Sequence, residues 1–289
     1  MSSSRLGLPA LYLSIFLLSL TGLFAKVIPL DATSIIQLRS LVATVGLACF
    51  MVVQKRRIRL SGVRAYAGVY ALGLLLGLHW VTFFHAMQVS SVAVGMLAMF
   101  TFPVVTILLE PLFSTRKLAA GDLVAGLVVL AGLGVMVGPG LTDLQRPVTL
   151  GVLFGTVSAL LFALRNLLQK YRFDGEPSDG LIFHQVIAIA LMLLPFIDYP
   201  RVQALSGAGI GNILLLGLLS TATGHTLLTF SLKQLPAKSV ALIQCLQPPL
   251  AALLAWWVIG ETPGLSVVVG GGMILSVAAY ESLRQTRGG

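Results

Sequence analysis

Two stretches of the chain, HWVTFFHAMQ at residues 79–88 and HTLLTFSLKQ at residues 225–234, carry histidine, phenylalanine and glutamine at the same three positions. The shift of 146 residues that aligns them also places Pro103 on Pro249 and Gly126 on Gly272. Nearer the start, a shift of 144 residues pairs three further residues: Gly7, Ser14 and Lys26 with Gly151, Ser158 and Lys170. The chain is therefore two copies of one unit, and we expect the first repeat at residues 1–143 and the second at 144–289.

The composition places both copies in a membrane. Hydrophobic residues make up 57% of the chain and charged residues 10%, compared with roughly 45–50% and 25% in soluble domains. Apolar runs of bilayer-spanning length are expected at residues 8–25, 33–53, 65–86, 90–113, 119–138, 149–169, 181–197, 209–232, 237–259 and 265–282. The predicted fold is an all-α membrane protein with ten transmembrane helices, five in each repeat.

The formal net charge of +9 is divided unevenly between the two sides of the predicted helices. Connections on one side carry 14 Lys and Arg residues and those on the other side carry three, while Arg39 and Arg165 lie within helices. By the positive-inside rule the basic side is cytoplasmic, and both termini belong to it. The charge is thus a topology signal, and we expect a lipid bilayer and no nucleic acid as partner.

Equivalent connections in the two repeats have opposite charge bias. The connection at residues 54–64 has five basic residues, whereas its counterpart near 198–206 has only Arg201. An odd number of helices in each repeat inverts the second copy in the membrane, in agreement with these charges. Inverted repeats are typical of secondary transporters, whose substrate site lies near the bilayer midplane between the repeats. The alternative is that the duplication only builds a scaffold or a channel.

Polar groups inside the predicted helices are the candidates for a substrate site. His79 and His225 occupy equivalent positions, where a histidine can carry a proton or bind a substrate carboxylate. With Gln244, Gln247 and neighbouring apolar side chains they form the predicted substrate site: His79, Trp80, Phe83, Met99, Phe100, Thr101, His225, Gln244 and Gln247. The alternative interpretation is that these side chains pack or hydrogen-bond between helices.

Prolines occur in the middle of the predicted fourth and ninth helices, at Pro103 and at Pro248 and Pro249. Proline has no N–H and clashes with the carbonyl four residues before it, so the helices are expected to break there. Unpaired carbonyls at membrane depth are tolerated only against protein or a water-filled cavity. We therefore interpret the three prolines as hinges beside the substrate cavity.

Two arginines lie inside predicted helices. Arg39 is about two turns inside the second helix, and Arg165 is near the inner end of the sixth. Each has two interpretations: it binds an anionic group of the substrate, or its side chain extends to the membrane interface. For Arg165 the extension to the interface is favoured.

The sequence motifs do not indicate an enzyme. The chain contains no GxxxxGK[ST], HExxH or GxSxG sequence, which argues against ATP hydrolysis and against protease or lipase activity. Cys49 and Cys245 fall inside predicted helices, so no disulfide framework is implied. We expect a protein that is not an enzyme, with no catalytic residue, cofactor or metal site.

Short motifs resemble the EamA-type branch of the drug/metabolite transporter superfamily. They are TGLFAK at residues 21–26, Arg39 in the second helix, and Pro249 followed by Glu261. Where that family usually has Trp before the first glycine and Glu after the proline of helix 4, this chain has Leu20 or Thr21, and Thr115. The resemblance covers the whole chain. It implies export across the bacterial cytoplasmic membrane through a cavity between helices 3, 4, 8 and 9, with helices 1 and 6 contributing.

We therefore predict a secondary or facilitative exporter that works by alternating access and takes hydrophobic or aromatic amino acids or similar small metabolites. Sugars, nucleobases and cationic drugs are alternative substrates, and a non-transporting membrane scaffold or sensor is the alternative from another class. Proton coupling and the oligomeric state are left open. A large polar cavity that reaches His79 and Gln244 would favour transport, whereas a dry packed bundle would oppose it.

Overall fold

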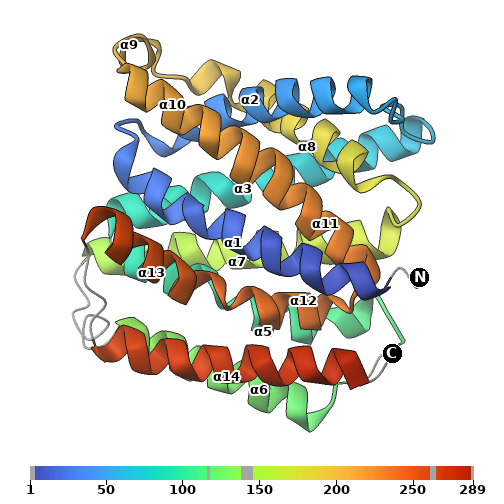
Figure 1. Cartoon of the computed structure of the whole chain (residues 1–289), viewed down its shortest axis with the longest axis vertical. Coiled ribbons are helices and arrows are strands. Elements are labelled where there is room, and N and C mark those ends of the chain that lie inside the picture. The colour runs from blue at the N-terminus through green and yellow to red at the C-terminus, as the bar shows by residue number, and fades with distance from the viewer. Residues whose placement is uncertain (1–3, 91, 116–117, 138–145, 261–264, 288–289) are drawn as a thin grey trace.

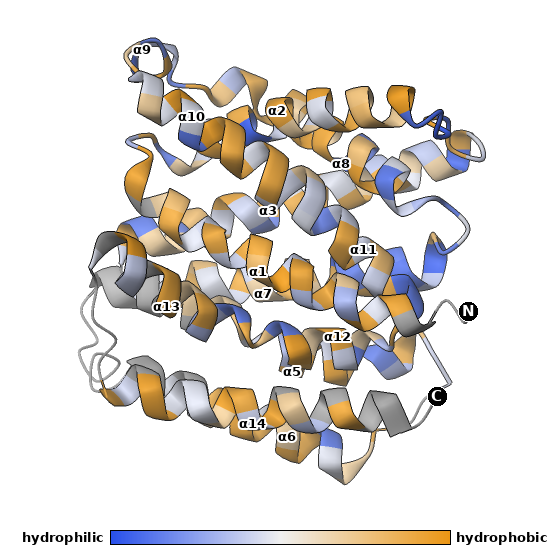
Figure 2. Ribbon diagram, viewed as in Figure 1, coloured by the Kyte–Doolittle hydropathy of each residue, from blue (hydrophilic) through white to orange (hydrophobic). Residues whose placement is uncertain are grey.

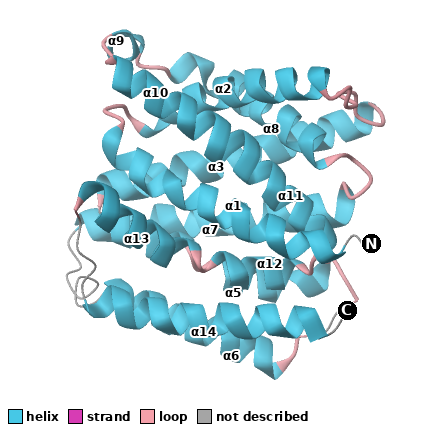
Figure 3. Ribbon diagram, in the orientation of Figure 1, coloured by secondary structure: helices cyan, strands magenta, loops and turns pink. Residues whose placement is uncertain are grey.

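The computed structural model describes residues 4–90, 92–115, 118–137, 146–260 and 265–287, which form a bundle of helices without strands (Figure 3). The first half of the chain contains α1 (Ser4–Val27), α2 (Ala32–Val53), α3 (Val63–Val89), α4 (Val92–Met99), α5 (Phe102–Leu109), η1 (Glu110–Leu112) and α6 (Ala120–Val137). The second half contains α7 (Arg146–Arg172), α8 (Ser178–Leu193), η3 (Leu194–Phe196), α9 (Tyr199–Gln203), α10 (Gly207–Leu215), η4 (Leu216–Gly224), α11 (His225–Gln234), α12 (Ala237–Gln244), α13 (Gln247–Ile259) and α14 (Leu265–Arg287).

Apart from the short helix α9, these elements make ten helical segments among the described residues, and the ends of the ten agree with the predicted spans to within five residues. Four segments are composite: α4–α5–η1, α8–η3, α10–η4–α11 and α12–α13. By length and composition, seven segments can cross a membrane, and shorter apolar helices lie at Phe102–Leu112, Ala120–Gly132 and Val268–Val277. The chain is an all-α membrane protein.

The hydrocarbon core of a membrane favours helical structure in the segments that cross it. Hydrocarbon offers no hydrogen bonds, so a spanning segment must satisfy its own backbone, and a helix does this within one segment. Large apolar side chains remain exposed on the outside of the bundle, among them Val45 at 63% and Leu127 at 64%, and Figure 2 shows orange along most of the helices. This surface faces lipid, because water would oppose such exposure.

The two halves of the chain pack against each other in matching ways. Helix α3 lies against α7 and α8, and the equivalent segment of the second half, η4–α11, lies against α1 and α2. The hydroxyl of Ser14 donates to the carbonyl of Gly224 at 2.8 Å, and that of Ser158 donates to the carbonyl of His79 at 3.0 Å. Since Ser14 and Ser158 are repeat counterparts, a similar contact occurs in both halves, although Gly224 comes one residue before His225, the counterpart of His79.

Helices α6 and α14 form a pair along one edge of the bundle (Figure 1). They approach so closely at Gly132 that an added Cβ would lie 2.9 Å from the carbonyl oxygen of Gly270. Small residues permit this approach in membrane helices. Figure 1 shows this pair at the edge of the bundle, so the centre of the bundle is formed by the other segments.

Helix breaks occur at the predicted prolines. Helix α4 ends at Met99 and α5 begins at Phe102, with Pro103 in its first turn. Helix α12 ends at Gln244, and α13 begins at Gln247 with proline in its first turn. A third irregularity was not predicted: η4 is a π-helix. Wide turns of this kind are uncommon and frequently accompany functional sites.

The described connections that belong to the Lys- and Arg-rich side lie at one end of the bundle, where α1 also begins and α14 ends (Figure 1). There the Lys233 ammonium donates to the carbonyls of Asp174 and Glu176. The Glu176 carboxylate accepts from the backbone N–H of Ser61 at 2.8 Å. This end is called the basic end below. Glu261, one of the resemblance residues, lies outside the described residues.

Candidate functional site

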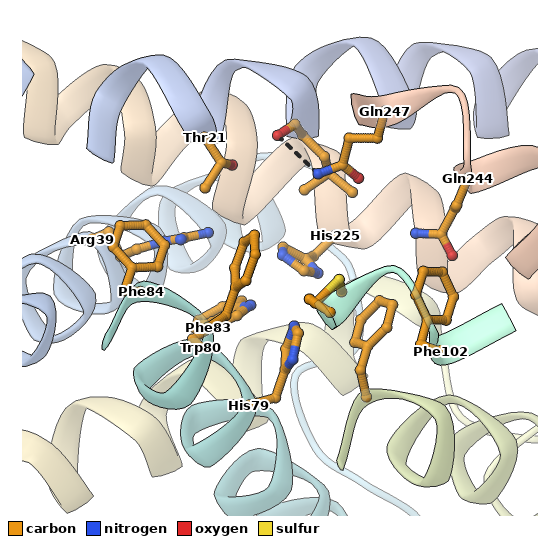
Figure 4. Close-up of a pocket in the computed structure, with 13 residues that line it drawn as sticks. Thr21, Arg39, His79, Trp80, Phe83, Phe84, Phe102, His225, Gln244 and Gln247 are labelled. Carbon is orange, nitrogen blue, oxygen red and sulfur yellow. Dashed lines mark hydrogen bonds between the residues drawn. The ribbon is translucent and has the colours of Figure 1, made fainter. Parts of the chain in front are cut away.

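A central cavity lies where segments of both halves meet, and its volume is about 30 Å³. Helices α1, α2, α3, α4, α5 and α7 contribute to it, as do α11, α12 and α13 (Figure 4). Its lining consists of Leu18, Thr21, Arg39, His79, Trp80, Phe83, Phe84, Met99, Phe102, Phe162, His225, Gln244 and Gln247.

Seven of the nine predicted substrate-site residues are brought together in this lining: His79, Trp80, Phe83, Met99, His225, Gln244 and Gln247. Phe100 and Thr101 lie outside it. The ring of Phe100 packs edge-on against Phe102 at 5.6 Å, and the Thr101 hydroxyl donates to the carbonyl of Ala98 at 2.7 Å. Helix α5 begins directly after these two residues, and its first residue, Phe102, lines the cavity instead.

The two equivalent histidines have different surroundings. Nδ1 of His79 lies 2.7 Å from the Ser158 hydroxyl oxygen, and its ring stacks on Phe162 at 4.5 Å. Since that hydroxyl donates its own proton to the His79 carbonyl, it accepts from Nδ1–H, which leaves Nε2 as an acceptor. Nδ1 of His225, by contrast, has no hydrogen-bond partner among the described residues.

The two glutamines also differ. The Gln247 amide donates to the carbonyl of Leu18 at 3.3 Å, across the interface between α13 and α1 (Figure 4). Gln244 is 2% exposed, and its Oε1 has no hydrogen-bond partner in the described part of the chain. An unpaired buried acceptor is costly, so Gln244 is suited to receive a donor from a ligand or from water.

Arg39 is the charged member of the lining and was not among the nine predicted residues. Its Nε donates to the Thr221 hydroxyl on the π-helix η4 at 2.7 Å, and its guanidinium lies 4.3 Å from the centre of the Trp80 ring. Helix α2 can approach η4 this closely because Gly217 lacks a side chain, and a Cβ there would lie 2.5 Å from Val42. The sequence signal was the arginine inside an apolar helix.

Arg165 does not extend to the membrane interface, so the favoured sequence interpretation is wrong. Its side chain is fully buried. Nε and Nη2 donate to Gln185 Oε1 at 2.9 and 2.6 Å, and Nη1 donates to Asn166 at 2.9 Å. These amide acceptors hold the guanidinium inside the bundle, which a hydropathy pattern cannot reveal.

At the basic end, Glu110 connects η1 with α7 and α12. Its Oε1 accepts from the Tyr171 hydroxyl at 2.7 Å and from the backbone N–H of Ala237 at 3.1 Å. Its Oε2 accepts from the N–H of Lys238 at 3.3 Å. The carboxylate thus caps the N-terminus of α12, where a negative charge is favourable, and ties the fourth segment to the ninth.

The lining combines aromatic and apolar side chains with a few polar groups, as small-molecule sites do, and among its described residues there is no carboxylate. The cavity reaches both His79 and Gln244, but it is small, not the large polar cavity that would favour transport. A volume of about 30 Å³ holds water and is too small for an amino acid. The lining must therefore separate before a solute of that size can enter.

The chain matches the EamA-like transporter family over residues 5–138 and again over 149–280. It is 24% identical to an uncharacterised transporter of Bacillus subtilis over 91% of this chain and 85% of the other. It is 22% identical to the S-adenosylmethionine uptake transporter of Rickettsia felis, over 72% of this chain and 69% of the other. A solved structure titled "Crystal structure of protein" superposes with a TM-score of 0.81 at 16% identity, covering 99% of this chain and 98% of the other. The last similarity concerns the fold alone.

Proposed function

Because the chain belongs to the EamA-like transporter family, we propose that it is a secondary transporter that exports amino acids or similar small metabolites through the central cavity. The observation that carries this proposal is the cavity itself, whose polar groups come from both halves of the chain. Gln244 ends α12 at one helix break, and His79 of α3 lines the same cavity as Met99 and Phe102, which flank the other break. Transporters built from inverted repeats place their substrates at such discontinuous helices.

The chemistry of the lining supports an amino acid as substrate. Phe83, Phe102 and Phe162 offer an apolar surface for a hydrophobic or aromatic side chain. His225 and Gln244 each offer a buried polar atom without a protein partner. A cationic drug is a weaker candidate, because the described lining has no carboxylate to neutralise it and contains Arg39. S-adenosylmethionine, named for the Rickettsia felis relative, also carries an amino-acid group and belongs in the test panel.

In this proposal the small cavity corresponds to a closed state between outward-open and inward-open states. The two repeats have inverted topology and divide near residues 143 and 144, and rocking of one against the other opens the cavity to each side in turn. Pro103, Pro248 and Pro249 are the hinges. The basic end faces the cytoplasm, both termini lie on that side, and the membrane is the bacterial cytoplasmic membrane.

Uptake into proteoliposomes tests the proposal. Purified full-length chain is reconstituted and offered radiolabelled phenylalanine, leucine, methionine and S-adenosylmethionine, with sugars and nucleobases as the alternative substrates. Each solute is measured with and without a pH gradient, so that proton coupling is seen as a gradient-dependent rate. Uptake of at least one amino acid above protein-free vesicles supports transport. If no solute moves under any gradient, a non-transporting scaffold or sensor becomes the better account.

A further inference from the structure

Arg39 is a cation inside the membrane-spanning bundle without a counter-ion in the described part of the chain. Its residue is 1% exposed, and none of the ion pairs between described residues includes it. Nε is bonded to Thr221 at 2.7 Å, but Nη1 has no hydrogen-bond partner. An unpaired buried charge is costly, so the fold retains this arginine for a purpose other than its own stability.

Arg165 shows how the same fold satisfies a buried arginine. It stands 144 residues after Thr21, and its partner Gln185 stands 146 residues after Arg39, which are the two spacings of the repeat. In the second half the guanidinium therefore meets a glutamine that accepts from two of its nitrogens. In the first half the arginine, Arg39, occupies the counterpart position of Gln185. The counterpart position of Arg165 holds Thr21, whose side chain is too short to do what Gln185 does. Thr21 and Arg39 both line the cavity.

We infer that Arg39 binds a carboxylate group of the transported solute, so that the cavity selects organic acids, amino acids included, over the corresponding amines. This inference rests on the proposed transport function and names the group that its substrate must carry. A planar guanidinium presents parallel N–H groups that match the two oxygens of a carboxylate. The incoming anion supplies the acceptors that Gln185 and Asn166 supply to Arg165.

The surroundings of Arg39 hold it in place for such an anion. The guanidinium lies between the Thr221 hydroxyl and the Trp80 ring, 4.3 Å from the ring centre, and 6.0 Å from the centre of Phe84. Stacking on Trp80 favours the charge without using the N–H groups that face the ligand. Figure 4 shows Arg39 and Gln244 at opposite sides of the cavity with His225 between them. A zwitterion can therefore place its carboxylate at Arg39 and direct its ammonium toward the Oε1 of Gln244.

Ligand-induced stabilisation measures binding independently of transport. The detergent-solubilised full chain is melted in the presence of phenylalanine, leucine or methionine, and in the presence of the decarboxylated amine of each. At least one acid is expected to raise the melting temperature, and its amine to bind about 10- to 100-fold more weakly, as expected for the loss of a hydrogen bond to a charged group. An amine that binds as tightly as its acid overturns the inference, as does an equal effect of sodium chloride.

Variants assign the effect to Arg39. Arg39→Gln is expected to lose the acid-dependent shift by the same factor, yet to melt without ligand no lower than the parent, because it removes an uncompensated charge. Arg165→Gln is the matched control: it is expected to melt lower, since it loses bonds to Gln185, and to keep the parent's affinity. If Arg39→Gln does not fold, Arg39→Lys retains the charge without the paired N–H groups and is expected to bind at least tenfold more weakly.

The two proposals fail separately. Acids that stabilise the parent but not Arg39→Gln, and that are not transported in proteoliposomes, uphold the arginine site and contradict transport. Acids and amines that are transported equally well uphold transport and overturn the arginine site. Parent-like affinity in Arg39→Gln or Arg39→Lys, or the absence of stabilisation by all three acids, also overturns it.

Discussion

The Nδ1 atom of His79 lies 2.7 Å from the Oγ atom of Ser158, which joins the centre of α3 to α7 at the wall of the cavity. The equivalent serine, Ser14, donates to the backbone carbonyl of Gly224, while Nδ1 of the equivalent histidine, His225, has no hydrogen-bond partner among the described residues. In both halves the serine thus donates to a backbone carbonyl, with the acceptor shifted by one residue, and among the described residues the histidine contact occurs in one half. This asymmetry allows the role of His79 to be tested against an internal control.

Ser158→Ala is expected to slow transport more than Ser14→Ala does. Both substitutions remove a buried hydroxyl that donates to a backbone carbonyl, at a cost of about 1 kcal/mol of stability each. Ser158→Ala also removes the shorter of the two contacts of the His79 Nδ1 and leaves the one to the Ser158 backbone carbonyl at 3.1 Å, so the ring is held less firmly. Melting temperatures and initial transport rates of the two variants provide the comparison. Equal transport rates at equal stability would show that the Ser158 contact has no role beyond packing.

His79→Ala and Gln244→Ala are each expected to weaken substrate binding by about 1–3 kcal/mol, or roughly tenfold or more, without lowering expression. Both residues present polar atoms to the cavity. Gln169→Ala is the control, because this buried glutamine donates to Thr229 at 3.0 Å and lies outside the lining. It should lower the melting temperature and leave the affinity unchanged. Parent-like affinity in both cavity variants would move the site elsewhere, with His225 as the next residue to test.

Pro103→Ala and Pro249→Ala are expected to slow transport while the protein remains folded. Alanine restores a backbone donor and removes the clash that opens the helix, so the fourth and ninth segments become stiffer at their breaks. Proteoliposome rates at saturating substrate would reveal the change, with melting temperature as the check on folding. Parent-like rates in both variants would exclude a hinge role for these prolines.

Glu110→Ala is expected to lower the melting temperature, because it leaves the first backbone N–H groups of α12 and the Tyr171 hydroxyl without their acceptor. Loss of a helix cap costs about 0.5–2 kcal/mol. Tyr171→Phe is the companion variant, since it removes one of the three hydrogen bonds of Glu110 and retains the ring. It should have the smaller effect. A Glu110→Ala protein as stable as the parent would show that water replaces the carboxylate at no cost.

A reporter fused after Gly289 is expected to be cytoplasmic, and one inserted near Leu141 is expected to be external. The reason is the excess of Lys and Arg in the connections at the basic end. Paired reporters, one active in the cytoplasm and one active outside it, distinguish the two positions. Locating both fusions on the same side would contradict an inverted repeat.

The sequence was sufficient for the helical segments because their determinants are local. Continuous apolar runs fix where a chain can cross a bilayer, and each run satisfies its backbone without help from its neighbours. The positions of Pro103 and Pro248 similarly fixed the two helix breaks, because the steric effect of proline acts within one turn. Among the predicted substrate-site residues that line the cavity, Met99, Gln244 and Gln247 stand beside these breaks, whereas His79 and His225 were indicated by their matched positions in the two repeats.

Only the tertiary structure decided which side chains meet. The geometry of the break between α4 and α5 places Phe102 rather than Phe100 at the cavity, and no apolar pattern distinguishes the two. The contrast between Arg39 and Arg165 depends on which residue a neighbouring helix presents: Thr221 binds one nitrogen of Arg39, whereas Gln185 and Asn166 accept from all three of Arg165. Rotation and register of packed helices are set by contacts between distant residues, so hydropathy places an arginine within a helix but decides neither whether its side chain is buried nor whether its hydrogen bonds are satisfied.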